Sequence, residues 1–384
     1  MPNTSFELTV LGCSGGPISG KTCSFLLKPS YVSIESILEK EIDCLLALDA
    51  GTGLTSIVDI LQHAAPNGGN HQKQVNYLLG LYPNDIETAN IENFIKNIKI
   101  VHPFKTLSSN SKAGLSSMTA LQLADCILNS ISAYLITHSH LDHVCSLAIN
   151  SPGFKTPKDV YASTSCINSI KSSLFNDEIW PDLVSMGMVN LHEILPNYKI
   201  NDYYSIESFP LSHGTINDGQ RYYSTAFLIK DRLKKDKLLW FGDVEADIIS
   251  NGNFNEDIWK KVTPFIIDKT LGTIMIECST VDKAPPYYGH MTPTTLFSEF
   301  IKLRKFCVDE KTGLKNNLNA DDTFYKNFKI QPLKDLNIII IHVKESMENN
   351  NPRITILEQL NRLNSEFNVG LNFVMALPGL SLIL

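Results

Sequence analysis

The amino-acid sequence predicts a large α/β fold. Short apolar or alternating runs that end in glycine or polar clusters predict strands, as at residues 6–11 and 44–48. Apolar residues at helical spacing follow such runs, for example over residues 54–61. With 384 residues, of which 43% are hydrophobic and 19% charged, the chain can bury a substantial core without disulfides.

Further elements follow in the same alternating order. A helix over residues 121–131 precedes a strand over 133–137. Later apolar runs predict strands at residues 224–229, 237–241, 273–276 and 336–341. The last helix is expected to begin with Asn351 as its cap and Pro352 in its first turn. Its apolar face should bury Ile354, Leu357, Leu360 and Leu363.

We expect one domain over residues 1–384. Residues 66–119 are rich in Asn, Ser, Gly and Lys, with helix-like stretches around residues 86–98, and they carry no recognisable group of reactive side chains. We interpret them as a peripheral insertion. No internal repeat of fixed short period interrupts the remaining pattern.

The overall charge and the cysteines restrict the class of protein. A formal net charge of −7 argues against binding of long nucleic acid, but a small anionic substrate needs only a local positive centre. Eight scattered cysteines form no C-x-x-C unit, which favours reduced thiols. Neither a signal peptide nor a run of membrane-spanning length is evident, so cytoplasm is the expected location. The sequence leaves open whether the protein forms a homodimer.

A dense group of metal-binding residue types follows the strand at 133–137. His138 and His140 face the same way in an extended segment and can bind one ion, while Leu141 should point into the core. If a helix begins there, Asp142 and His143 point roughly 100° apart and can serve a second ion. Histidine and aspartate suit zinc, manganese or iron. A purely structural zinc is less favoured, because such sites usually close with cysteine ligands.

This His-x-His-x-Asp-His segment resembles the signature of the metallo-β-lactamase superfamily. The resemblance implies an αβ/βα sandwich of two mixed sheets, with helices outside and metals at one edge. It also implies three further ligands. His213 would complete the first metal site, Asp243 would bridge both ions, and His342 would complete the second. Two divalent transition-metal ions are therefore expected, with Zn²⁺ as the favoured identity.

Other segments resemble the class II cyclic-nucleotide phosphodiesterases, in particular the fungal low-affinity 3',5'-cAMP enzymes. The segments are residues 11–17, 174–183, 287–292 and 342–345. The resemblance spans nearly the whole chain, except the Asn/Ser-rich insertion and the region around 306–330. Ile341 stands where a small hydroxyl residue is expected. The implied reaction is hydrolysis of cAMP, and also cGMP, to the 5'-monophosphate by a two-metal-activated hydroxide.

Several residues are candidates for roles beside the metals. Glu277 and His290 resemble an acid pair in which Glu277 orients His290, and His290 donates a proton to the leaving 3' oxygen. The competing interpretation is a buried pair that holds a loop. Asp49 is expected to orient a metal-binding histidine. Weaker candidates are Lys344 for a phosphate contact, and Trp180, Tyr287 and Tyr288 for stacking on a purine.

Three other functions stay open on the sequence alone. A tRNA 3'-processing endonuclease, or another phosphodiesterase, shares the metal site and the Glu/His pair, although the acidic balance disfavours long RNA. A thiolester or lactone hydrolase is a weaker alternative, because the sequence shows no sign of a site for a thiol conjugate. An inactive metal-binding scaffold would be expected to have lost ligands, whereas every expected position is filled.

Overall fold

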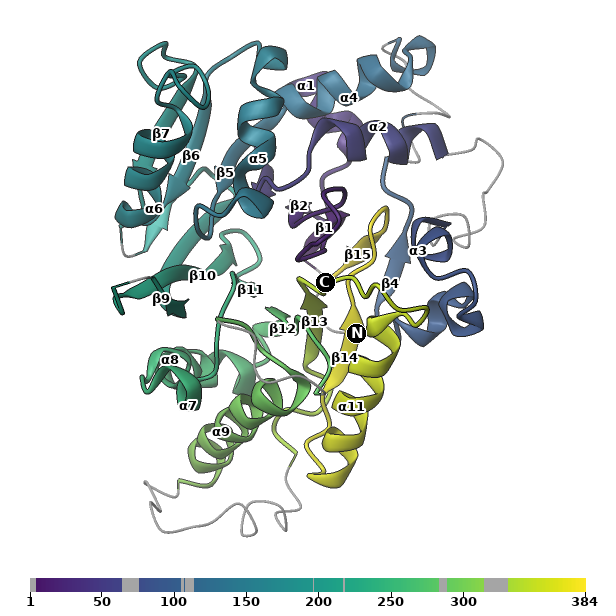
Figure 1. Ribbon diagram of the computed structural model, residues 1–384, viewed down its shortest axis with the longest axis vertical. Coiled ribbons are helices and arrows are strands. Elements are labelled where there is room, and N and C mark those ends of the chain that lie inside the picture. Colours follow the sequence, from purple (N-terminus) through teal and green to yellow (C-terminus); the bar gives the residue numbers. More distant parts are fainter. Residues whose placement is uncertain are drawn as a thin grey trace.

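The computed structural model describes residues 5–63, 76–104, 107, 114–195, 197–216, 218–282, 289–313 and 331–384. Two mixed β-sheets share one continuous hydrophobic core, and helices lie on their outer sides (Figure 1). The predicted sandwich of two mixed sheets is therefore confirmed. The first and last described segments meet in the first sheet, where the Phe6 amide donates a hydrogen bond to the Leu384 carbonyl.

The first sheet contains eight strands. Its parallel half, β3-β5-β6-β7, follows an antiparallel half that includes β1 and β2. In spatial order the strands are β4 (Lys99–Val101), β15 (Ser381–Ile383), β1 (Phe6–Gly12), β2 (Ser24–Pro29), β3 (Leu45–Leu48), β5 (Ile131–Leu135), β6 (Lys158–Ala162) and β7 (Val189–Glu193).

The second sheet contains seven strands and is also mixed. Strands β11 to β14 run parallel, and β8, β9 and β10 complete the sheet with antiparallel pairs. In spatial order the strands are β14 (Asn372–Met375), β13 (Asn337–Ile341), β12 (Leu271–Glu277), β11 (Lys237–Phe241), β10 (Arg221–Asp231), β9 (Tyr204–Thr215) and β8 (Tyr198–Lys199).

Two groups of helices cover the sheets (Figure 1). The first sheet carries α1 (Ile34–Lys40), α2 (Leu54–His63), α4 (Ala120–Asn129), α5 (Leu141–Ile149) and α6 (Thr164–Ser169). The second carries α7 (Asp247–Ser250), α8 (Phe254–Ile267), α9 (Pro293–Thr312) and α11 (Pro352–Glu366), and α9 packs against both α8 and α11. The remaining helical segments are short: α3 (Asn76–Leu81), η2 (Ile86–Ala89), η3 (Ile91–Asn93), η5 (Leu115–Ser117), η6 (Ser151–Gly153) and η7 (Ile170–Leu174).

Two local predictions in and before the metal-binding segment need correction. Helix α4 ends at Asn129, two residues before the predicted residue 131, and strand β5 covers Ile131–Leu135, so it begins and ends two residues before the predicted bounds 133–137. Leu141 was expected in the core, but its side chain is 67% exposed. The reason is that α5 begins at this residue, and His140 and Leu141 occupy its solvent-facing first turn.

The final helix forms as predicted. Asn351 caps α11 by accepting a hydrogen bond from the Arg353 amide. Leu357 and Leu360 are buried, whereas Ile354 and Leu363 are only partly buried against the core. The helix therefore buries a narrower apolar face than the spacing of its apolar residues predicted.

The described part of residues 66–119 lies at the edge of the first sheet. Strand β4 pairs with β15, and the Phe94 carbonyl accepts a hydrogen bond from the Met375 amide. Phe94 and Tyr82 are each only 1% exposed. Residues 66–75, 105–106 and 108–113 lie outside the described residues. The described part is thus peripheral in position but packed into the common core.

A buried ion pair ties the start of α11 to the segment after β13. Arg353 binds both carboxylate oxygens of Glu345, with N–O distances of 2.8 and 2.6 Å, and the Tyr82 hydroxyl donates to Glu345 at 2.9 Å. Because removing either partner would leave an uncompensated buried charge, this pair fixes the position of the segment after β13 relative to α11. Within the described ranges, no helix has the length and apolar content needed to cross a membrane.

Candidate active site

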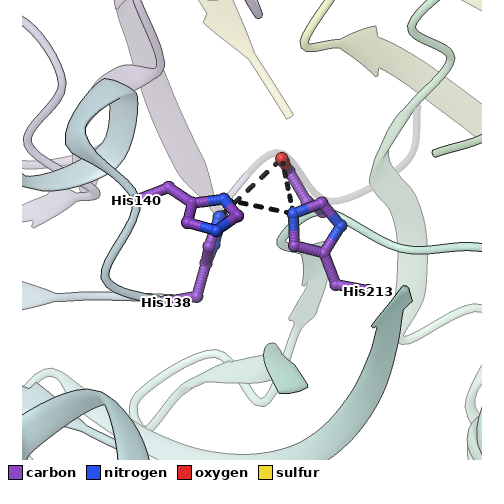
Figure 2. A group of neighbouring side chains, drawn as sticks. His138, His140 and His213 are labelled. Atoms are coloured by element: carbon purple, nitrogen blue, oxygen red, sulfur yellow. Dashed lines mark hydrogen bonds and ion pairs between the residues drawn. The ribbon is translucent and has the colours of Figure 1, made fainter. Parts of the chain in front are cut away.

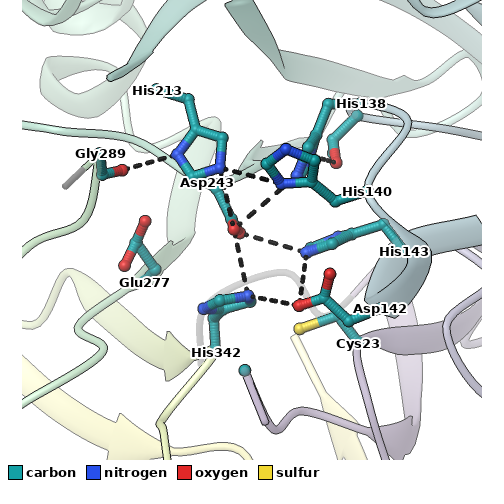
Figure 3. Close-up of polar contacts among 12 residues, drawn as sticks. Cys23, His138, His140, Asp142, His143, His213, Asp243, Glu277, Gly289 and His342 are labelled. Carbon is teal, nitrogen blue, oxygen red and sulfur yellow. Dashed lines mark hydrogen bonds and ion pairs between the residues drawn. The ribbon is translucent and has the colours of Figure 1, made fainter. Parts of the chain in front are cut away.

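The seven predicted metal ligands come together from both sheets (Figure 3). The first sheet supplies those that follow β5 and begin α5, and the second sheet supplies those on β9 and after β11 and β13. They are His138, His140, Asp142 and His143 from the first sheet, and His213, Asp243 and His342 from the second. Residues 200 positions apart thus share one site, as in the contact between Asp142 and His342.

Asp243 lies at the centre of this cluster. Its Oδ2 atom is 3.8 Å from His138 Nε2, 3.6 Å from His213 Nε2 and 3.1 Å from His342 Nε2. Its Oδ1 atom is 3.4 Å from His143 Nε2. One carboxylate therefore faces imidazoles of both predicted metal sites, which is the position a bridging ligand requires.

The first predicted group is compact. Ligand atoms of His138, His140, His213 and Asp243 all lie within 4.8 Å of one another (Figure 2). The Nδ1 atom of His140 is 3.3 Å from His213 Nε2. Three imidazoles and one carboxylate at this spacing match the ligand number of a zinc site.

The second predicted group lies on the other side of Asp243. Asp142 Oδ2 is 3.2 Å from His342 Nε2 and 3.7 Å from His143 Nε2. The buried Cys23 thiol also lies within 4.8 Å of ligand atoms of His143 and His342. Sequence reasoning missed Cys23, because nothing in its local segment places it beside residues more than a hundred positions away.

Hydrogen bonds fix the orientation of four imidazoles by engaging their Nδ1 atoms. His143 donates to Asp49 at 2.7 Å, as the sequence predicted for that carboxylate. His213 donates to the Gly289 carbonyl at 2.7 Å. His342 Nδ1 lies 3.0 Å from the Ser279 hydroxyl, and His138 Nδ1 lies 3.0 Å from the Thr137 hydroxyl. Such outer contacts direct Nε2 lone pairs towards a common centre.

Backbone geometry contributes to the same arrangement. Gly289 has a φ of +75°, and a Cβ atom there would lie 2.7 Å from His213 Nδ1. His342 and Asp49 adopt the left-handed region with φ of 58° and 54°. Non-glycine residues rarely occupy this region unless their surroundings impose it, and functional sites are where such strain concentrates.

The electrostatics of the cluster fit a bound cation. Burial lowers the pKa of His140 to about 4 and holds that of His138 well below its usual value, so both are neutral as metal binding requires. Burial opposes protonation of His143, but Asp243 and Asp49 raise its pKa, so the negative charge facing this ring is the charge that a bound cation would neutralise. The Nε2 atoms of His138 and His143 are buried without a hydrogen-bond partner. Unpaired buried nitrogens are costly unless a ligand satisfies them, so the residues present fit metal ions.

The predicted acid pair forms beside this cluster. His290 Nδ1 is 3.0 Å from Glu277 Oε1, and Glu277 is completely buried. Burial alone would lower the pKa of His290, but the Glu277 carboxylate raises it. Ser279, which the sequence analysis did not single out, donates to Glu277 at 2.5 Å and also contacts His342. It therefore links the acid pair to the second metal group.

Tyr222 is a second neighbour that sequence reasoning missed. Its ring stacks on His140, with centroids 4.7 Å apart and planes 4° from parallel. Its hydroxyl lies 3.0 Å from the Ser139 hydroxyl. This stacking covers one face of the His140 ring and restricts its rotamers. A single tyrosine in strand β10 carries no sequence signal for this role.

The weaker candidates for contacts with phosphate and base differ in where the structure places them. Lys344 donates a hydrogen bond to the Gly15 carbonyl at 3.2 Å. Lys344 lies near the acid pair, because its charge lowers the pKa of His290 and so partly offsets the effect of Glu277. Trp180 donates to the Ser151 hydroxyl at 3.0 Å and packs partly buried against the core, as a turn anchor does. Tyr287 and Tyr288 lie outside the described residues.

Comparison with known proteins shows similarity over the whole chain. A family model described as cAMP phosphodiesterases class-II matches residues 81–379. A 3',5'-cyclic-nucleotide phosphodiesterase from Candida albicans is 32% identical, over 99% of this chain and 100% of the relative. The 3',5'-cyclic-nucleotide phosphodiesterase 1 of Saccharomyces cerevisiae is 31% identical over 99% of both. The crystal structure of unliganded yeast PDE1 matches with a TM-score of 0.82 and 28% identity, covering 100% of both chains.

Proposed function

The chain belongs to the class-II cAMP phosphodiesterases, and we propose that it hydrolyses 3',5'-cyclic nucleotides at two divalent metal ions held by the His/Asp cluster. The observation that carries this proposal is the position of Asp243. Its carboxylate lies between two groups of imidazoles. Two of these imidazoles have a buried Nε2 atom without a hydrogen-bond partner. The same family membership disfavours the alternatives of a tRNA 3'-processing endonuclease and an inactive scaffold.

We assign three imidazoles and one carboxylate to the first ion, and two imidazoles and two carboxylates to the second, with Asp243 shared between them. The first ion would be held by His138, His140, His213 and Asp243. The second would be held by Asp142, His143, His342 and Asp243. Nitrogen and oxygen ligands of this kind make zinc our proposed ion. When bound, two such ions polarise a water molecule and neutralise phosphate oxygens.

Cleavage also requires a proton for the departing oxygen. Attack of water at phosphorus breaks the bond to the ribose 3' oxygen and leaves a 5'-monophosphate. We assign His290 as the proton donor, because Glu277 binds its Nδ1 atom and favours the protonated imidazole. The Nε2 atom is then the one that transfers the proton. Glu277 and Ser279 act by holding this ring in place.

His290 has a competing role as a metal ligand. Its ligand atom lies within 4.8 Å of those of Asp243 and His342, and its Nδ1 atom is 3.8 Å from Asp243 Oδ2. We favour the acid role, because the 3.0 Å contact with Glu277 occupies the nitrogen that faces Asp243.

We further propose that the enzyme acts in the cytoplasm. All eight cysteines are free thiols in the structure, and six of them are buried. Free thiols are the usual state in a reducing compartment. An intracellular cyclic-nucleotide pool is the substrate that this location would supply.

A substrate panel tests the proposed function. We expect the zinc-loaded protein to convert cAMP and cGMP into 5'-AMP and 5'-GMP, and to leave a tRNA precursor and a β-lactam intact. A chelator should abolish turnover, and added metal should restore it. Cleavage of the tRNA precursor with intact cyclic nucleotides would instead support the endonuclease alternative. Bound metal without turnover of any substrate would support an inactive scaffold.

A further inference from the structure

Tyr82 belongs to the peripheral region of residues 66–119, but its hydroxyl lies against the segment that follows β13. The hydroxyl donates a hydrogen bond to Glu345 at 2.9 Å and accepts one from the Ser346 amide at 2.9 Å. Arg353, at the start of α11, binds the same carboxylate and completes a buried triad of Tyr82, Glu345 and Arg353. None of the catalytic or metal-binding roles assigned above uses this triad.

A second group of contacts joins the same two parts of the chain, which lie side by side in Figure 1. Asp85 accepts a hydrogen bond from the Asn351 amide at 3.0 Å, and the Asn351 side chain donates to the Thr88 hydroxyl at 3.3 Å. Because Asn351 caps α11, these contacts fix the start of the helix that carries Arg353. Residues 82–88 therefore support the triad from two sides.

The triad fixes the orientation of the Glu345 carboxylate as well as its position. Arg353 makes two contacts with it, and such paired contacts with a planar guanidinium restrict rotation of the carboxylate. Arg353 is 0% exposed and Glu345 is 5% exposed, so solvent ions screen this pair only weakly. The Glu345 side chain is therefore a fixed point in the chain.

This fixed point lies three residues after the predicted metal ligand His342. The backbone between them is also held, because the Lys344 amide donates to the Ser279 carbonyl at 2.9 Å and the Glu345 amide donates to the Gly16 carbonyl at 2.8 Å. No slack segment separates the two side chains. A displacement of Glu345 would therefore move the backbone of His342.

His342 has a backbone conformation that its surroundings must impose. Its φ of 58° lies in the left-handed region, which residues with a Cβ atom rarely occupy. Strand β13 holds the chain before it, since Ile341 pairs with Glu277, and the triad holds the chain after it. In this conformation His342 Nε2 lies 3.2 Å from Asp142 and 3.1 Å from Asp243 (Figure 3). Releasing the chain on either side would let the backbone relax and carry the imidazole away from both carboxylates.

We propose that the triad of Tyr82, Glu345 and Arg353 positions the second metal ion by holding His342 in its left-handed conformation. The proposal rests on the proposed function, because it assumes that His342 binds a metal ion. Within the described ranges, no hydrogen bond or ion pair joins the triad to the histidines of the first ion, so its effect is confined to the second. The region interpreted from the sequence as a peripheral insertion thereby acts on the active site through Tyr82.

Zinc binding to the two halves of the centre tests this proposal without relying on catalysis. Tyr82→Phe removes one hydroxyl and keeps the packing of the ring, so the fold should be retained. The affinity for the second zinc ion should fall by about tenfold, the lower end of the usual effect of losing a contact behind a metal ligand. The affinity for the first ion should stay the same. Equilibrium dialysis of the metal-free protein against Zn²⁺ measures both affinities.

The dependence of turnover on zinc gives a second readout. In Tyr82→Phe, kcat for cAMP should fall at limiting zinc and return to the parent value in excess zinc, because every metal ligand is still present. A variant that was only less stable would show no such recovery. Circular dichroism of the same samples records whether the fold is retained.

Arg353→Lys is the second variant. It keeps the positive charge but loses the paired contacts of the guanidinium, and it should weaken binding of the second ion by about tenfold to hundredfold. Tyr31→Phe is the matched control, because the Tyr31 hydroxyl also donates to a carboxylate, that of Asp231 at 3.0 Å, but at the end of β10. Both zinc affinities of this control should equal those of the parent protein.

The outcomes separate this proposal from the proposed function. An unchanged affinity for the second ion in the folded variants would overturn the role of the triad, and Tyr82→Phe decides alone if Arg353→Lys does not fold. An equal loss of affinity for both ions would also overturn it, because general destabilisation would then explain the result. In both cases the parent protein would still bind two ions and hydrolyse cAMP. If the parent protein itself binds fewer than two zinc ions, the proposed two-metal centre fails and the role of the triad fails with it.

Discussion

Replacement of His290 by alanine is expected to lower kcat for cAMP by about 10²–10⁴-fold, the usual effect of removing a positioned general acid. The physical reason is that the ribose alkoxide leaves poorly without a proton. Metal content should stay unchanged, because Glu277 already occupies His290 Nδ1 at 3.0 Å in the proposed arrangement. Steady-state kinetics and elemental analysis of the same preparation measure both effects.

Two controls isolate the proton-transfer role. Bis(p-nitrophenyl) phosphate releases a phenolate that departs without protonation, so His290→Ala should affect it far less than cAMP. His192→Ala makes the same chemical change at a half-exposed histidine that pairs with Asp159 outside the site, and it should leave kcat intact. Equal losses on both substrates, or loss of metal from His290→Ala, would show that His290 supports the metal centre instead.

Replacement of Asp142 by alanine is expected to reduce turnover of cAMP by about 10³-fold or more. Loss of one ion removes several kcal/mol of transition-state stabilisation. Asp142 contacts His342 and His143, and its side chain is 30% exposed, so the change does not touch core packing. Metal content should fall towards one ion per chain, while circular dichroism shows the fold retained.

Asp125→Ala provides a matched control for this variant. Its side chain is 32% exposed and pairs with Lys155 on the surface, where an ion pair contributes little to stability. We expect this variant to keep both ions and full turnover. If Asp142→Ala also keeps two ions and hydrolyses cAMP normally, that carboxylate is not part of the second site.

The sequence predicts the parts of the site that lie in one short segment. His138, His140, Asp142 and His143 follow a strand within six positions, and their residue types alone indicate metal binding. His213, Asp243 and His342 were predicted only through family resemblance, because a single histidine or aspartate after a strand has no distinctive pattern. The structure brings them to the same centre.

The contacts that surround these residues could not be predicted, because they depend on packing between distant segments. Ser279 lies 63 positions from His342, and Tyr222 lies 83 positions from Ser139. Leu141 was misplaced for a local reason, since the exact residue at which α5 begins decides which way its side chain points.

Titration of the metal-free protein with Zn²⁺ tests the central claim most directly. Formation of 5'-AMP from cAMP is followed as the ion is added in measured equivalents. The two-metal account predicts that turnover appears only with zinc and saturates at two ions per chain, as expected for two ligand groups that share Asp243. Saturation at one ion, or full turnover in metal-free protein, would contradict it.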